Sequence, residues 1–244
     1  MPFITHRGQR IHYTVEGAGP LLILQHGLLM DAESWRRNGV AGALASRFRV
    51  ACIDSLGHGL SDKPGAAALY GQAQRAGDIV AVMDALGADR AHLIGYSMGA
   101  WLAVGVAKHH RDRLASLVIG GWNLVEGAYP GLRFDALMAY AAKTTPGLIA
   151  WITPALRPGV QASFDALSEL SGASDAVLHA GVPVMLWNGR TDPYHDPMKA
   201  YAASHALPFT SSEGDHLTAI LHPDAATLRA LDGFLDAAEA KRGR

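Results

Sequence analysis

Residues 95–99 of the chain match the pattern G-x-S-x-G, with Ser97 at its centre. The pattern lies where an apolar, strand-like run at residues 91–94 meets a helix-like run at residues 100–107. A serine on such a sharp turn is held in strained backbone angles, and its hydroxyl stands clear of the main chain where a base can reach it. The two glycines let the turn close, because a side chain at either position would collide with the neighbouring strand and helix. This arrangement indicates a nucleophilic serine.

Two residues farther along the chain supply a base and an acid. Histidine side chains exchange protons near neutral pH, so a histidine at position 216 can take the proton of Ser97 and later return it to a leaving group. A carboxylate at Asp192 would accept a hydrogen bond from the far N–H of the ring and stabilise the imidazolium. Asp215 adjoins His216 and would struggle to bend back onto its ring, and Asp196 lies farther from the preceding strand. We therefore predict a catalytic triad of Ser97, Asp192 and His216, in the chain order Ser, Asp, His.

Acyl transfer also needs hydrogen-bond donors already aimed at the negative charge that develops on the substrate oxygen. Met98, directly after the serine, offers one backbone N–H. The loop after the strand-like residues 21–25 offers a second at Leu28, because Gly27 lets the backbone approach closely. We expect an oxyanion hole formed by Leu28 and Met98, with His26 as scaffolding that holds the loop.

These residues need a framework that brings them together. Apolar runs typical of buried strands alternate with segments of helical spacing, and this predicts a mostly parallel sheet with helices on both faces. The strand-like runs cover residues 21–25, 48–53, 91–95, 114–120, 182–188 and 208–211, the helical spacing is clearest at residues 76–86 and 225–238, and a β-hairpin precedes them at residues 2–6 and 9–16. The three predicted triad residues each follow a strand-like run, and active residues gather at the carboxyl ends of strands in such sheets.

The alternation breaks between residues 122 and 180. This segment has no clear strand, but it contains several aromatic residues and helix-like pieces such as residues 132–142. An unbroken loop of that length is improbable, so we predict a helical cap inserted over the carboxyl edge of the sheet. The chain then divides into a core of residues 1–121 and 181–244 and a cap of residues 122–180. The residues expected to shape a substrate pocket are Trp122, Trp151 and Phe164.

Composition limits the partners. A chain of 244 residues with 49% hydrophobic residues can bury one large core. The net charge of -1 and pI near 6.9 indicate neither a nucleic-acid nor a membrane partner, so we expect a small-molecule substrate, with the oligomeric state left open. The sequence has no pattern typical of a metal or nucleotide site, and no cofactor is expected.

The compartment is predicted from what the chain lacks. The first residues have neither a long apolar core nor a small-residue cleavage site, and the longest apolar stretch is well short of the ~18 residues that span a bilayer. The only cysteine, Cys52, lies in a strand-like run and is expected to be a packed small hydrophobe rather than a reactive thiol. We therefore expect a cytoplasmic protein.

Taken together, these residues resemble the α/β-hydrolase family. The resemblance rests on His26-Gly27, on D-x-x-G-H-G-x-S-D at residues 54–62, on the G-x-S-x-G pattern, and on Asp192 and His216, which together span nearly the whole chain. It implies an α/β-hydrolase fold, a loop at residues 54–62 that braces the floor of the active site with His58 in a structural role, and a cap that shapes the pocket.

The predicted function is a serine hydrolase that cleaves small or medium carboxylic esters with a hydrophobic acyl or alcohol part through an acyl-enzyme. Family members that open epoxides or remove halides need a carboxylate where this chain has Ser97. Carbon–carbon hydrolases of the family often carry Trp after the catalytic histidine, where this chain has Leu217. The alternatives are carbon–carbon, lactone or thioester hydrolysis or perhydrolysis on the same triad, or a slow-turnover ligand-binding or signalling protein. The cap residues expected in solvent or against a substrate carboxylate are Arg133, Lys143 and Arg157.

Overall fold

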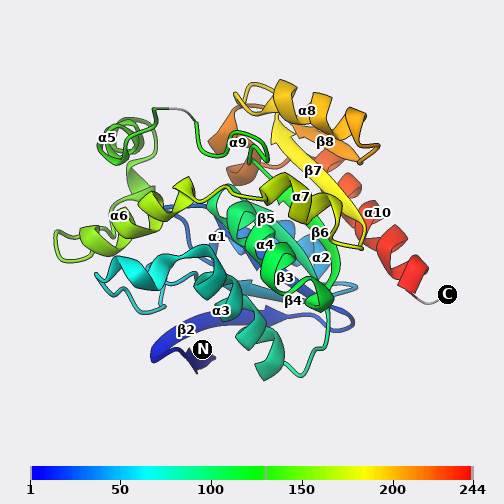
Figure 1. Cartoon of the computed structure of the whole chain (residues 1–244), viewed down its shortest axis with the longest axis horizontal. Coiled ribbons are helices and arrows are strands. Elements are labelled where there is room, and N and C mark those ends of the chain that lie inside the picture. The colour runs from blue at the N-terminus through cyan, green and yellow to red at the C-terminus, as the bar shows by residue number, and fades with distance from the viewer. Residues whose placement is uncertain (1, 130, 243–244) are drawn as a thin grey trace.

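The structure is a computed structural model that describes residues 2–129 and 131–242 (Figure 1). The predicted core was expected to begin at Met1 and end at Arg244, so residues 1 and 243–244 of it lie outside the described residues, as does Pro130 of the predicted cap. Within this range the chain forms one central sheet flanked by helices, with α5 (Phe134–Thr144) and α6 (Arg157–Asp165) projecting to one side (Figure 1).

Eight strands of the described residues form one sheet in the order β1-β2-β4-β3-β5-β6-β7-β8. The six strands from β4 to β8 in this order are parallel, whereas β1 pairs antiparallel with β2, and β2 with β4. The predicted mostly parallel sheet is therefore confirmed. The strands are β1 (Phe3–His6), β2 (Gln9–Glu16), β3 (Leu21–Gln25), β4 (Arg49–Ile53), β5 (Ala91–Tyr96), β6 (Leu114–Gly120), β7 (Val184–Gly189) and β8 (Phe209–Ser212).

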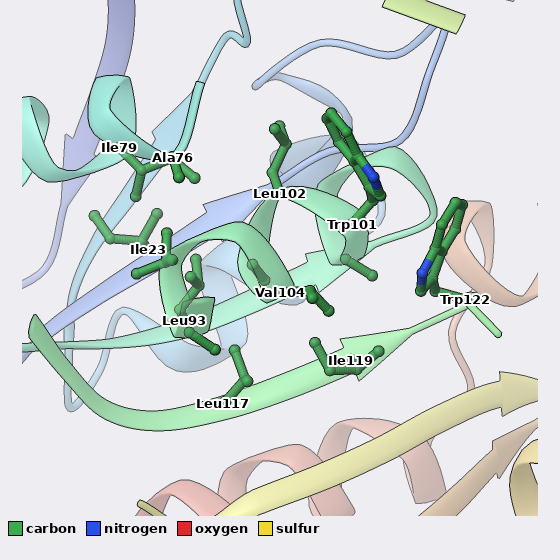
Figure 2. Packing of buried hydrophobic residues seen from close by; sticks show 14 of the residues in the cluster. Ile23, Ala76, Ile79, Leu93, Trp101, Leu102, Val104, Leu117, Ile119 and Trp122 are labelled. Carbon is green, nitrogen blue, oxygen red and sulfur yellow. The ribbon is translucent and has the colours of Figure 1, made fainter. Parts of the chain in front are cut away.

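Helices cover both faces of the sheet, because the side chains of each buried strand alternate between two apolar clusters. In β3, Ile23 points into one cluster with α3, α4, α7 and α8, and Leu24 points into the other with α1, α2, α9 and α10. Figure 2 shows strand residues such as Ile23 and Ile119 packed on the side of the sheet that the buried helix α4 covers. The helices are α1 (Ser34–Arg37), α2 (Val40–Leu44), α3 (Gln72–Ala85), α4 (Met98–His109), α7 (Ala173–Leu178), α8 (His195–Ser204), α9 (His216–Leu221) and α10 (Ala225–Arg242).

The segment between β6 and β7 is helical. Among its described residues it contributes no strand to the sheet, and it contains α5 (Phe134–Thr144), α6 (Arg157–Asp165) and α7. α7 packs beside α4 on the core, whereas α5 and α6 extend past the sheet (Figure 1). Buried residues of these two helices, Phe134 and Val160, form a small apolar cluster with Leu29. The segment therefore sits on the loop that follows β3.

Cys52 lies in β4 with 1% of its surface exposed, as expected of a packed hydrophobe. Burial raises the pKa of its thiol to about 12, which leaves almost no reactive thiolate at neutral pH. Across residues 2–129 and 131–242, no helix combines the length and the apolar character that a membrane crossing requires.

Candidate active site

Ser97 lies on the turn between β5 and α4, where the sequence pattern places it. Its φ of 55° and ψ of -117° are strained for a residue with a side chain, and its N–H is held by the carbonyl of Gly120, 2.7 Å away in the neighbouring strand. A Cβ at Gly95 would collide with the carbonyl of Gly99, and a Cβ at Gly99 with that of Gln25 in β3. Only hydrogen fits at either position, so the glycines make this turn possible.

The structure brings Ser97, His216 and Asp192 together from three separate parts of the chain. The Oγ of Ser97 lies 3.0 Å from Nε2 of His216, and Nδ1 of the same ring lies 2.7 Å from Oδ2 of Asp192. Because a carboxylate only accepts hydrogen bonds, Nδ1 carries the ring proton and Nε2 presents its lone pair to the serine hydroxyl. This is the tautomer that can remove a proton from Ser97.

The three candidate acids have different partners. Asp192 is buried, and its second oxygen accepts the backbone N–H of Tyr194 at 2.9 Å. Asp215 accepts the backbone N–H of Thr218 at 2.8 Å and so caps α9, and this hydrogen bond lowers the pKa of its carboxyl group. Asp196 is exposed and lies 2.7 Å from His195. Of the three, Asp192 alone contacts the ring of His216.

The two predicted oxyanion donors have unoccupied backbone N–H groups. Within residues 2–129 and 131–242, neither Leu28 nor Met98 donates its N–H to a protein acceptor. Gly27 lies against the nucleophile, since a Cβ added to Gly27 would stand 3.4 Å from the Cβ of Ser97. The loop that presents the Leu28 N–H therefore passes directly beside Ser97.

His26 fixes the peptide that carries the Leu28 N–H. The backbone N–H of Ser55 donates to Nε2 of His26 at 3.1 Å, so the ring proton is on Nδ1, which donates to the Gly27 carbonyl at 2.8 Å. The same carbonyl accepts the N–H of Met30 at 3.2 Å. In a trans peptide the N–H points opposite to the carbonyl, so both contacts also set the direction of the Leu28 N–H. Burial lowers the pKa of His26 and keeps the ring neutral, in line with its expected scaffolding role.

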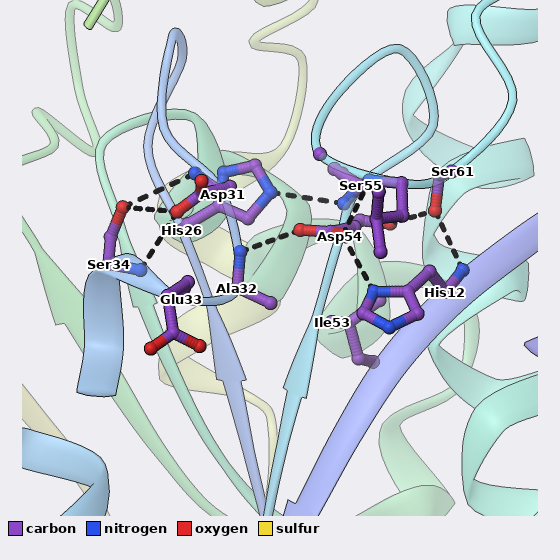
Figure 3. A network of polar contacts seen from close by, with 12 residues as sticks. His12, His26, Asp31, Ala32, Glu33, Ser34, Ile53, Asp54, Ser55 and Ser61 are labelled. Atoms are coloured by element: carbon purple, nitrogen blue, oxygen red, sulfur yellow. Dashed lines mark hydrogen bonds and ion pairs between the residues drawn. The ribbon is translucent and has the colours of Figure 1, made fainter. Parts of the chain in front are cut away.

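The loop at residues 54–62 lies beside the loop that follows β3 and is hydrogen-bonded to it, as Figure 3 shows. Asp54 accepts hydrogen bonds from the backbone N–H of Ala32 at 2.6 Å, from His12 at 2.7 Å and from the N–H of Leu60 at 2.8 Å. His58 is fully buried beside the rings of His26 and Trp151. Because Ala32 belongs to the loop that follows β3, Asp54 holds that loop in place.

A family model described as the α/β hydrolase fold matches residues 20–122, which include the β3 loop, Asp54 and Ser97. Solved structures of similar shape extend the match to 96–97% of the chain. The chain therefore has the α/β-hydrolase fold.

Among curated relatives, epoxide hydrolase B of Mycobacterium tuberculosis is 35% identical over 116 residues, which are 46% of this chain and 32% of that protein. The chain spans about a third to about a half of the length of the curated relatives it matches. A thermophilic esterase from Thermogutta terrifontis superposes with a TM-score of 0.78 at 22% identity, covering 97% of this chain and 98% of the other. An enol-lactonase from Burkholderia xenovorans gives 0.74 at 24%, covering 96% and 100%. At these identities the two structures show the fold.

A cavity of about 340 Å³ opens in front of Ser97 and His216. Of the three residues predicted to shape a substrate pocket, Trp122 and Phe164 line this cavity. Trp151 does not line the cavity. Its Nε1–H donates to the Leu29 carbonyl at 3.3 Å, and its ring packs beside the ring of His58. A second, more open hollow of about 510 Å³, between the end of α4 and α7, contains none of the predicted site residues.

Several residues at the site were not predicted. Tyr96 and Tyr194 flank His216 with ring centroids 5.4 and 5.9 Å from its ring, and no pattern in the sequence singles them out. Leu137, Tyr140 and Ala141 of α5 line the cavity from the cap. Their spacing of three and four residues marks one helix face, which is a signal that the sequence does contain.

The lining of the cavity contains acidic but no basic side chains among Asp, Glu, Lys and Arg of the described residues. Among the described residues that line it, the acidic ones are Asp192 and Asp215, and neither lysine nor arginine is present. The cap cations Arg133, Lys143 and Arg157 lie elsewhere, and Arg157 is paired with Asp135 at 2.7 Å. In the described part of the chain, His, Cys, Asp and Glu form no group of three that could hold a metal ion. The site therefore places acyl-transfer groups beside a largely apolar pocket whose described lining includes two carboxylates and no lysine or arginine.

Proposed function

We propose that this protein is a serine hydrolase that cleaves small or medium carboxylic esters through an acyl-enzyme. The observation that carries the proposal is the unbroken hydrogen-bonded series from Ser97 through His216 to Asp192, with distances of 3.0 and 2.7 Å, at the wall of an apolar cavity. Nucleophile, base and orienting acid are the set that acyl transfer requires.

The geometry supports a two-step reaction. His216 takes the proton of Ser97 as its Oγ attacks the ester carbonyl, and the negative charge on the carbonyl oxygen is stabilised by the N–H groups of Leu28 and Met98. His216 then donates that proton to the departing alkoxide as the carbon–oxygen bond breaks. A water molecule, deprotonated by the same ring, attacks the acyl-enzyme and releases the acid.

Chemistry at Ser97 separates this chain from relatives named for epoxides or halides. A carboxylate that displaces such a leaving group forms an ester, which water can cleave, whereas a serine would form a stable ether. The similarity to epoxide hydrolase B, which covers 46% of this chain, is therefore attributed to a shared framework. Lactones contain the same acyl bond as esters and belong to the proposed substrate range.

The decisive experiment is covalent labelling with a neutral fluorophosphonate, with the modified residue identified by mass spectrometry. We expect a single label on Ser97 and none in the Ser97→Ala variant, together with multiple turnovers on p-nitrophenyl acetate. A panel of esters, thioesters and lactones then ranks the leaving groups. A stoichiometric burst without turnover on any member of the panel would favour a ligand-binding protein instead.

A further inference from the structure

Asp215 is the charged residue at the cavity that the triad does not use. It lines the cavity next to His216, and Oδ1 accepts the N–H of Thr218 at 2.8 Å. That hydrogen bond favours the ionised carboxylate and lowers the pKa of Asp215. Asp192 adds a second negative charge, and the lining residues described here include no cation that would offset either.

The remaining walls are suited to a cation rather than to an anion. Trp122, Tyr129, Tyr140, Phe164 and Tyr194 all line the cavity. The faces of aromatic rings carry negative partial charge and attract ammonium groups, most of all substituted ones that shed water easily. A carboxylate or sulfonate entering the same space would lose its hydration, find no positive partner and be repelled by two carboxylates.

We propose that this cavity selects its substrates by charge, rejecting anionic esters and preferring esters that carry a compact substituted ammonium group, with Asp215 as the residue that sets the preference. The inference rests on the proposed function, because it describes the substrate of the same site. Asp215 acts here as a specificity residue and takes no part in proton transfer.

Asp215 also caps α9, and the two roles can be separated. Asparagine caps helices as well as aspartate does, so Asp215→Asn removes the charge and keeps the cap. Glu213 provides a matched control on the same loop. It is 2.6 Å from Arg190, its side chain is 73% exposed, and it does not line the cavity. Glu213→Gln therefore removes one negative charge two residues away without changing the cavity wall.

The test compares three butyrate esters of nearly equal size. Butyrylcholine is cationic, 3,3-dimethylbutyl butyrate is its neutral isostere, and 2-sulfoethyl butyrate is anionic. We expect kcat/KM to fall in that order. Asp215→Asn should lower the ratio of kcat/KM for the cationic ester to kcat/KM for the neutral ester by about ten-fold. The effect is limited because water and salt partly screen the attraction between one carboxylate and the ammonium group. Glu213→Gln should leave the ratio within about two-fold, because its charge is solvent-exposed and already paired.

Binding to the Ser97→Ala variant, measured by calorimetry with the same three esters, separates the two proposals. Hydrolysis of the neutral ester with no preference for the cationic one, or a ratio that Asp215→Asn leaves unchanged, overturns the charge selectivity and leaves the hydrolase proposal standing. If no ester is hydrolysed by the wild type but the variant binds butyrylcholine most tightly, the hydrolase proposal fails and the charge selectivity holds. Equal dissociation constants for all three esters count against the selectivity in either case.

Discussion

The Tyr96 hydroxyl donates a hydrogen bond to the backbone carbonyl of His216, 2.8 Å away. Tyr96 ends β5 directly before Ser97, so this bond joins the strand that carries the nucleophile to the residue that carries the base. Burial raises the pKa of the Tyr96 phenol well above its ordinary value, and the group therefore remains a donor across the working pH range. We therefore expect the distance between Ser97 and His216 to depend on this contact as well as on their own hydrogen bond.

Replacing Tyr96 by phenylalanine tests that dependence. We expect kcat on p-nitrophenyl acetate to fall about three- to ten-fold as the loop loses its anchor, and the free energy of unfolding to fall by about 1 kcal/mol. Tyr70 is a matched control. Its buried side chain donates a hydrogen bond of 2.7 Å to the Pro64 carbonyl, and this contact lies outside the active site. Tyr70→Phe should cost similar stability in urea titrations and leave kcat unchanged. Equal kcat values for both variants would show that the Tyr96 bond is only structural.

Asp192 carries a prediction about the ring proton. In Asp192→Asn, an amide N–H facing Nδ1 of His216 favours the tautomer that has its proton on Nε2, and that tautomer cannot accept the proton of Ser97. We expect kcat to fall by about 10⁴-fold with the melting temperature nearly unchanged. Asp196→Asn is the control, because that side chain is 92% exposed, and it should keep wild-type kcat. A loss in the Asp196 variant larger than that in the Asp192 variant would reassign the acid.

The glycines of the turn predict a steric effect on folding. Gly99→Ala places a methyl group against the Gln25 carbonyl, and we expect a loss of several kcal/mol or a failure to fold. Gly233→Ala is the contrasting case, since nothing lies within 4 Å of a Cβ there and the residue is inside α10. That change should stabilise the protein by about 0.5–1 kcal/mol through helix propensity. Thermal unfolding of both variants decides the point, and a stable Gly99→Ala protein would contradict the geometry.

Much of the framework was predictable because buried strands read as unbroken apolar runs. The runs at residues 21–25 and 114–120 match β3 and β6 without shift. β7 begins at Val184 rather than at residue 182, because Pro183 has no N–H to donate to the sheet. α3 begins at Gln72 rather than at residue 76, because its first turn buries the polar Gln72 and Arg75, which show no apolar spacing.

The pocket was less predictable because it depends on how the cap segment is oriented. Trp122 and Trp151 are both aromatic and both lie in the predicted cap, yet one lines the cavity and the other packs behind the loop of Leu29. Composition does not distinguish them. The hydrogen bond from Tyr96 to His216 joins residues 120 positions apart, and only the folded structure reveals it.

Buried histidines predict how stability changes with pH. His58 is fully buried, and burial lowers its pKa well below 6.5; burial lowers the pKa values of His26 and His92 as well. Below pH 6.5 the unfolded chain therefore binds more protons than the folded one, so the free energy of unfolding is greatest near neutrality and falls as the pH drops. Each such histidine contributes a slope of up to about 1.4 kcal/mol per pH unit.

Replacing His58 by phenylalanine removes one of these groups. Urea unfolding at several values between pH 5 and 7 should give a shallower loss of stability on acidification than in the wild type, by as much as about 1.4 kcal/mol per unit. The slope is the informative quantity, because a packing change from the new ring shifts the free energy equally at every pH. His179→Gln is the control, since its side chain is 71% exposed in the folded chain, and it should keep the wild-type slope. A His58→Phe slope equal to that of the wild type would mean that protons reach His58 in the folded state, and that the packing around His26 and Trp151 opens on acidification.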